Sequence, residues 1–114
     1  MREKIPEFRV RPGVTKHQLY QAGFTDEGDH WTYQQFLYER FVLVKILISK
    51  EDFFCTTKII RTDTGGFYSA FYNTIFGPRN LVAEKVTERY CRLLRRLNRA
   101  DVIEFVEEKN KVHD

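Results

Sequence analysis

The sequence predicts an α+β fold, in which an antiparallel meander of three to four strands packs against a long C-terminal helix, with a small N-terminal strand and helix. Two observations predict this: the middle of the chain is dense in aromatic and β-branched residues, and an amphipathic segment follows it. The chain has 114 residues, of which 42% are hydrophobic, and a net charge of +3. Since no repeat or linker divides it, we expect residues 1–114 to form a single globular domain.

The N-terminal part predicts one short strand and one short helix. Residues 5–11 alternate loosely between apolar and polar side chains, and the turn pair Pro12-Gly13 stops this strand. Thr15 suits the N-cap of the following helix, and Gly23 suits its left-handed C-terminal cap.

Residues 31–74 have the composition of β structure. Residues 41–48 are apolar on both alternating faces, which predicts a central strand covered on two sides. After a polar turn we expect a second strand over residues 53–60, and after an Asp-Thr-Gly-Gly turn a third strand over residues 67–72. These three segments form the expected meander.

Residues 31–38 allow two interpretations. Thr32 and Gln35 have the spacing of a helix capping box, and the apolar residues that follow could line a short helix. The high content of aromatic and β-branched residues favours a strand instead, and we take the strand as the prediction.

The C-terminal part predicts one long helix over residues 79–98, with Pro78 suited to its first turn. Six apolar side chains fall within an arc of about 120° and should lie on the sheet. They are Val82, Val86, Tyr90, Leu93, Leu94 and Leu97. Asp101 and Glu104 repeat the spacing of a capping box, so we expect a short last helix up to residue 106.

Several classes of protein are excluded or disfavoured. The longest apolar stretch, residues 41–48, is interrupted by Lys45 and is far shorter than the roughly 20 residues of a membrane span. We therefore expect no membrane partner, and the charged N-terminal residues lead us to expect a cytoplasmic protein. Cys55 and Cys91 have no neighbouring cysteine or histidine, so we interpret both as small buried thiols in a reducing compartment.

No pattern in the sequence carries catalytic chemistry. The two serines lie outside any nucleophile motif, and His17, His30 and His113 are dispersed without the spacing of metal ligands. No glycine-rich loop leads into a helix, as a phosphate-binding loop would. We therefore name no catalytic residue, no metal ligand and no cofactor, and we do not expect an enzyme.

The feature that stands out is a row of arginines on the predicted long helix, which we call the arginine stripe. Its members project within about 120° of one another, beside the apolar face. They are Arg89, Arg92, Arg95, Arg96 and Arg99. Three interpretations compete. The cations stabilise the helix dipole, or acidic residues of segments 26–29 or 101–108 pair with them within one chain or across a dimer, or they bind an anionic partner such as nucleic acid.

The aromatic content of 15% suggests more apolar surface than a monomer of this size hides. We therefore expect a non-catalytic binding or assembly module that self-associates and offers the arginine stripe to an acidic protein. The alternative is a nucleic-acid-binding protein that uses the arginine-rich face of helix 79–98. Aromatic residues on the strands could add stacking contacts in that case.

Overall fold

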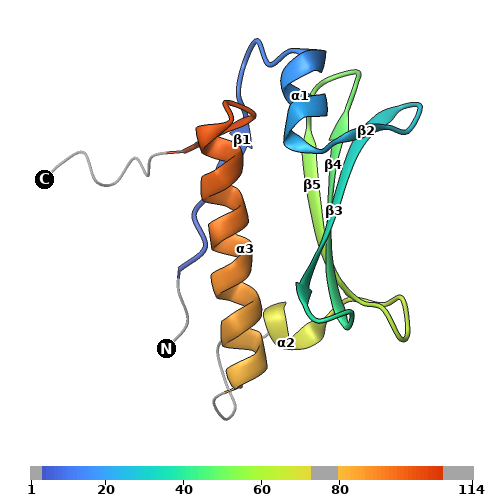
Figure 1. The fold of residues 1–114 in the computed structure, drawn as a ribbon, viewed down its shortest axis with the longest axis vertical. Coiled ribbons are helices and arrows are strands. Elements are labelled where there is room, and N and C mark those ends of the chain that lie inside the picture. Colours follow the sequence, from blue (N-terminus) through green and yellow to red (C-terminus); the bar gives the residue numbers. More distant parts are fainter. Residues whose placement is uncertain (1–3, 73–79, 107–114) are drawn as a thin grey trace, which may run out of the picture.

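The computed structural model of the chain describes residues 4–72 and 80–106. It has an α+β fold with two layers, a four-stranded antiparallel sheet and a layer of helices (Figure 1). The elements in chain order are β1 (Phe8–Val10), α1 (Lys16–Ala22), β2 (Thr25–Asp26), β3 (His30–Tyr38), β4 (Val42–Ser49), β5 (Cys55–Arg61), α2 (Ser69–Tyr72), α3 (Leu81–Arg99) and β6 (Ile103–Phe105).

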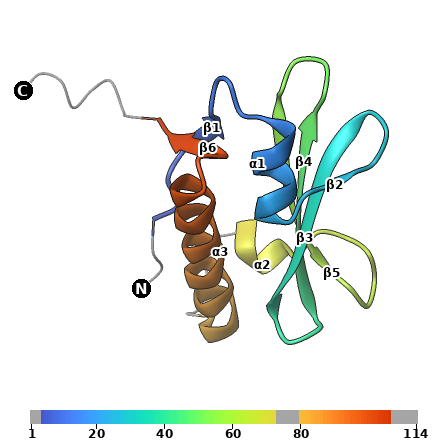
Figure 2. The ribbon, with the colours of Figure 1, turned by 45° about the horizontal axis from the view of Figure 1, so that its top comes forward.

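The four-stranded sheet has the order β2-β3-β4-β5, and all three helices lie on one of its faces (Figures 1 and 2). The helix-facing side chains of β4 have no exposed surface; they are Val42, Val44, Ile46 and Ile48. Leu43, Lys45 and Leu47 point to the other face and are only half-buried. The expected central strand is thus confirmed, but the expected cover on two sides is wrong, because no element of the described residues lies over the second face.

The strand interpretation of residues 31–38 is confirmed by β3, which pairs with β4 along its whole length. The register shifts between Phe36 and Tyr38, so a β-bulge lies at this point. The expected second strand corresponds to β5, which begins two residues later, at Cys55.

The third strand expected over residues 67–72 is wrong. Phe67 makes one isolated bridge to Ile60, and the chain then turns into the short helix α2. Tyr68 and Phe71, three residues apart, are both buried in the core. The Phe71 ring packs edge-on against Tyr90 of α3, with ring centroids 5.6 Å apart. Helical spacing brings both rings into the core, which a strand could not do because 68 and 71 would face opposite ways.

Helix α3 begins at Leu81, and residue 79, where we expected the helix to begin, lies outside the described residues. Asn80 is its N-cap, and the Asn80 side chain accepts a hydrogen bond of 3.0 Å from the backbone N–H of Ala83. Pro78 lies outside the described residues. The predicted apolar face is confirmed, since five of its six residues are buried and Val82 is half-buried. No helix in the described part of the chain is long and apolar enough to cross a membrane.

The short last helix expected after Asp101 is also wrong. Asp101 has a left-handed backbone, with φ of 63°, and the chain then forms strand β6. Strand β6 pairs with β1 to form a separate two-stranded sheet at one end of α3 (Figure 2). Ile103 of β6 is completely buried, and Glu104 accepts a hydrogen bond of 2.6 Å from Arg9 of β1. Pairing with β1 therefore outweighs the local capping-box signal.

Candidate anion-binding site

The arginine stripe lies along α3 as predicted, and four of its five members face a single hollow between α3 and β3. This hollow has a volume of about 340 Å³, and we call it the arginine hollow. It is lined by Gln35, Arg89, Arg92, Leu93, Arg96 and Arg99. The fifth member, Arg95, is exposed and does not line it.

Arg96 is held in place by the sheet beneath it. Its Nη2 donates a hydrogen bond of 2.7 Å to the hydroxyl of Tyr33, and the guanidinium carbon lies 5.4 Å from the centre of the Tyr33 ring. A longer contact of 3.5 Å reaches the carbonyl of Ala22, at the C-terminal end of α1. The Tyr33 hydroxyl in turn donates to Oε1 of Gln35 at 2.6 Å. These bonds fix the guanidinium group at the edge of the hollow.

Gly23 fixes the position of Tyr33. It ends α1 in the left-handed conformation, with φ of 104°. A β-carbon at Gly23 would lie 2.9 Å from Cε1 of Tyr33, which is closer than side chains approach. Only glycine therefore combines this backbone turn with the tyrosine ring packed against it.

Arg89 is anchored at the other end of the hollow. Its Nη1 donates a hydrogen bond of 3.0 Å to the backbone carbonyl of Leu37. Leu37 lies at the β-bulge of β3 and has no register partner in β4. The bulge thus supplies the carbonyl that holds Arg89.

The oxygens that hold Arg89 and Arg96 are all uncharged, which decides the electrostatics of the hollow. Carbonyl and hydroxyl oxygens accept hydrogen bonds but do not neutralise a guanidinium group. Of the four arginines in the hollow, only Arg92 has a carboxylate of the described chain within 4.0 Å, that of Glu88 at 3.4 Å. Both of those side chains are at least half exposed, so the pair is weak. The hollow therefore keeps most of its positive charge.

The expectation that acidic segments pair with the stripe within one chain is wrong for Asp26, Asp101 and Glu104, whose ion pairs are with other basic residues. Glu104 contacts Arg9 at 2.6 Å, and Asp26 contacts Lys50 at 2.5 Å. The hydrogen bond from Lys50 lowers the pKa of Asp26 below its ordinary value. These carboxylates are engaged with basic residues outside α3, and residues 107 and 108 lie outside the described residues.

The described residues show neither an activated thiol at Cys55 nor a cluster of metal ligands. Cys55 and Cys91 form no disulfide; Cys91 is buried as predicted, whereas Cys55 is half-buried. Burial raises the pKa of Cys55 to about 11, the opposite of what an activated nucleophile needs. Within residues 4–72 and 80–106, no group of three or more histidine, cysteine or acidic residues could hold a metal ion.

Sequence reasoning missed the residues of β3 that complete the hollow. Gln35 and Tyr33 alternate with outward-facing positions of β3, so both face the helices. Gln35 could have indicated the site, because positions on the helix-facing side of a strand are usually apolar and a glutamine there is unexpected. The hydrogen bonds that the carbonyls of Ala22 and Leu37 accept from the arginines could not be predicted from any sequence pattern.

The chain has a two-layer α+β fold, with a four-stranded antiparallel sheet packed against a long C-terminal helix. A similar solved structure is the crystal structure of a DUF1831 family protein from Lactobacillus plantarum, with a TM-score of 0.67. The alignment covers 91% of this chain and 94% of that chain, at 15% sequence identity. This likeness shows the fold alone. No model of a protein family matches the sequence, and no curated protein matches it either.

Proposed function

We propose that the protein is a non-catalytic binding module that takes a carboxylate-rich segment of a partner protein into the arginine hollow. One observation carries the proposal: Arg89 and Arg96 are held by neutral oxygens of β3 and α1, so they are positioned but not neutralised. A positioned guanidinium group loses little conformational entropy on binding and can still donate its remaining N–H groups to a carboxylate.

The lining of the hollow favours an acidic protein segment over nucleic acid. Apart from the arginines it offers Gln35 and Leu93, neither of which can stack on a base. The Tyr33 ring nearby is already covered by Arg96. Nucleic acid remains the alternative, because the arginines from Arg89 to Arg99 span about 15 Å along one side of a helix, enough for several phosphates.

Binding of a fluorescently labelled hexaglutamate peptide, followed by anisotropy across a salt series, tests the proposal. Arg96→Gln removes one positioned charge, and we expect it to weaken binding about tenfold. Arg95→Gln is the matched control, since it removes a neighbouring exposed arginine outside the hollow and should leave the affinity within about twofold. Equal effects of the two substitutions would refute the proposed site.

Labelled single-stranded and duplex oligonucleotides form the second arm of the same experiment. If they bind more tightly than hexaglutamate, with a steep salt dependence that Arg96→Gln flattens by about one unit, the nucleic-acid alternative replaces the proposal. If only the peptide binds, the alternative is excluded.

For self-association, the proposed contact is the face of the sheet that the helices leave uncovered. Four apolar side chains form a row across it, because Phe36 pairs with Leu43, Leu43 with Ile60, and Ile60 with Phe67. Phe36 is 48% exposed and Phe67 is 61% exposed. A second copy that packs on this row would bury both rings.

Charge sets the orientation of such a dimer. Lys45 and Lys58 pair with each other and lie two residues along from Leu43 and Ile60, on the same face. Rotation of a second copy about an axis along the apolar row places the two lysine pairs on opposite sides of it, which limits their repulsion. Light scattering after size exclusion should show a dimer that Phe36→Glu converts to a monomer; a monomeric parent protein would refute this contact.

A cytoplasmic location is also proposed, and the free thiols support it. Cys55 and Cys91 are unbridged in the structure. Free cysteines are typical of reducing compartments. Fractionation of cells that produce a tagged protein tests this, and recovery from an oxidising compartment would contradict it.

A further inference from the structure

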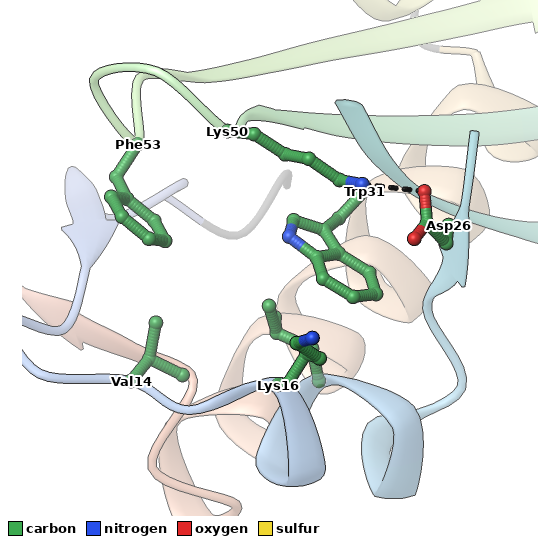
Figure 3. A pocket seen from close by; sticks show the side chains of 7 residues that line it. Val14, Lys16, Asp26, Trp31, Lys50 and Phe53 are labelled. Carbon is green, nitrogen blue, oxygen red and sulfur yellow. Dashed lines mark hydrogen bonds and ion pairs between the residues drawn. The ribbon is translucent and has the colours of Figure 1, made fainter. Parts of the chain in front are cut away.

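A second hollow lies between α1, β3 and the turn that joins β4 to β5 (Figure 3). We call it the tryptophan hollow. Its volume is about 320 Å³, at the lower end of the range for small-molecule sites. Leu19 and Trp31 are its most buried lining residues, at 1% and 5% exposure. Figure 3 shows Phe53, Val14 and Trp31 on different sides of it, so the hollow has a mainly apolar wall.

Phe53 has an unusual backbone for its residue type. Its φ is 59°, in the left-handed region that favours glycine and is unfavourable for a bulky aromatic residue. A hydrogen bond of 2.9 Å from its N–H to the carbonyl of Ser49 holds the turn in this shape. Phe53 is 44% exposed, so its ring is only partly covered by the rest of the protein. Such strain persists where the side chain serves a function, and here the ring lines the hollow.

The charged residues that line the hollow are Lys16, Lys50 and Asp26, and together they carry a net charge of +1. The ammonium group of Lys50 lies 4.9 Å from the centre of the Trp31 ring and donates to Oδ1 of Asp26 at 2.5 Å. Lys50 and Asp26 therefore neutralise each other. Lys16 also lines the hollow, and its positive charge helps to lower the pKa of Asp26. In the described part of the chain its ammonium group makes no hydrogen bond and has no carboxylate within 4.0 Å. Its charge remains available to a ligand.

We infer that the tryptophan hollow binds a small amphiphilic anion, whose flat aromatic body lies between Phe53 and Trp31 and whose single acidic group meets Lys16. The apolar wall supplies the area for an aromatic ring. Phe53, at 44% exposure, offers most of the accessible aromatic surface, because Lys50 lies over the Trp31 ring and Tyr20 packs edge-on against it. Lys16 supplies the charge complement, and the Asp26–Lys50 pair contributes no net charge. This site is separate from the arginine hollow and does not depend on the function proposed for it.

The fluorescent anion 1-anilinonaphthalene-8-sulfonate is a suitable probe, because it combines an aromatic body with one acidic group. Trp31 is the only tryptophan of the chain, so energy transfer from its emission to the bound probe reports binding near it. The uncharged analogue N-phenyl-1-naphthylamine measures the apolar contribution alone. We expect Lys16→Gln to weaken binding of the sulfonate about tenfold and to leave the uncharged analogue unaffected.

Phe53→Gly tests the aromatic wall. Glycine accepts the left-handed backbone, so the thermal unfolding midpoint should not fall, while both probes should bind about tenfold more weakly. Two matched controls lie outside the hollow and outside the proposed dimer contact: Lys85→Gln for the charge and Phe54→Ala for the exposed ring. The inference is overturned if Lys85→Gln weakens sulfonate binding as much as Lys16→Gln does, or if Phe54→Ala matches Phe53→Gly.

Discussion

The anchored cations of the two hollows donate to different kinds of acceptor. In the arginine hollow, Arg89 and Arg96 donate to carbonyl and hydroxyl oxygens, which carry no charge. In the tryptophan hollow, Lys50 donates to the carboxylate of Asp26. Both arrangements fix a cationic side chain, but only the first leaves the charge free to attract an anion. The nature of the acceptor, rather than the number of basic residues, therefore indicates which cations are available for binding.

Reversal of one charge in each hollow should give the largest difference between the two hollows in their effect on hexaglutamate affinity. Arg96→Glu places a carboxylate where the acidic peptide would bind, and we expect hexaglutamate affinity to fall by about 100-fold or more. Lys50→Glu, the matched reversal in the tryptophan hollow, should change that affinity by less than about twofold. Fluorescence anisotropy measures both. Comparable losses would mean that overall charge, and not the arginine hollow, governs peptide binding.

A methyl group at Gly23 should displace Tyr33, which accepts a hydrogen bond from Arg96 in the arginine hollow. Gly23→Ala combines a left-handed backbone with a contact of 2.9 Å to Tyr33, and we expect urea unfolding to show a loss of about 1–3 kcal/mol. Gly28→Ala is the control, because Gly28 has φ of 84° but open space around a β-carbon. It should lose less, and the difference reports the contact with Tyr33. Equal losses would show that Tyr33 moves aside without cost.

Removal of the Tyr33 hydroxyl should have a smaller effect. Tyr33→Phe deletes the oxygen that accepts from Arg96 and donates to Gln35, with both partners half-buried. We expect a loss of about 1 kcal/mol in the free energy of unfolding and a few-fold loss in hexaglutamate affinity. The same substitution at Tyr20, an exposed residue of α1, should change neither quantity. Unchanged affinity in Tyr33→Phe would mean that Arg96 needs no support from β3.

The smallest effect concerns the Asp26–Lys50 pair at acid pH. Because Lys50 lowers the pKa of Asp26 below 3.8, the pair stabilises the folded state above that pH and is lost as the pH falls through the lower folded value. The unfolding midpoint of the parent protein should therefore exceed that of Asp26→Asn slightly near neutral pH. The two midpoints should converge in strong acid. A difference that persists there would show that the carboxylate acts through something other than its charge.

Helix α3 and the arginine stripe could be predicted because their signal is long and regular. Over 19 residues the 3.6-residue period places apolar side chains on the sheet and arginines beside them. Short segments gave weaker signals, and tertiary contacts decided their structure. Residues 67–72 became mostly helical because Tyr68 and Phe71 both reach the core, and the residues after Asp101 became a strand because β1 offered an edge.

The candidate site could be predicted only in part for the same reason. Four of the five arginines of the stripe line the hollow, because one helical face carries them all. The expected contribution of Phe53 to a strand was wrong, since a left-handed turn places its ring over the second hollow instead. The acceptors that leave Arg89 and Arg96 charged are backbone carbonyls and one hydroxyl from distant segments. No local pattern encodes which carbonyl a guanidinium group will meet.

Nuclear magnetic resonance of the arginine side chains can show whether neutral acceptors leave these charges available. Addition of hexaglutamate to the parent protein should shift the Nε–Hε signals of Arg89 and Arg96. The signal of Arg61, whose guanidinium is paired with Asp63 at 2.7 Å, should stay unchanged. If Arg61 shifts as far as Arg89 and Arg96, or if these two do not respond, then the arginine hollow is not an anion-binding site.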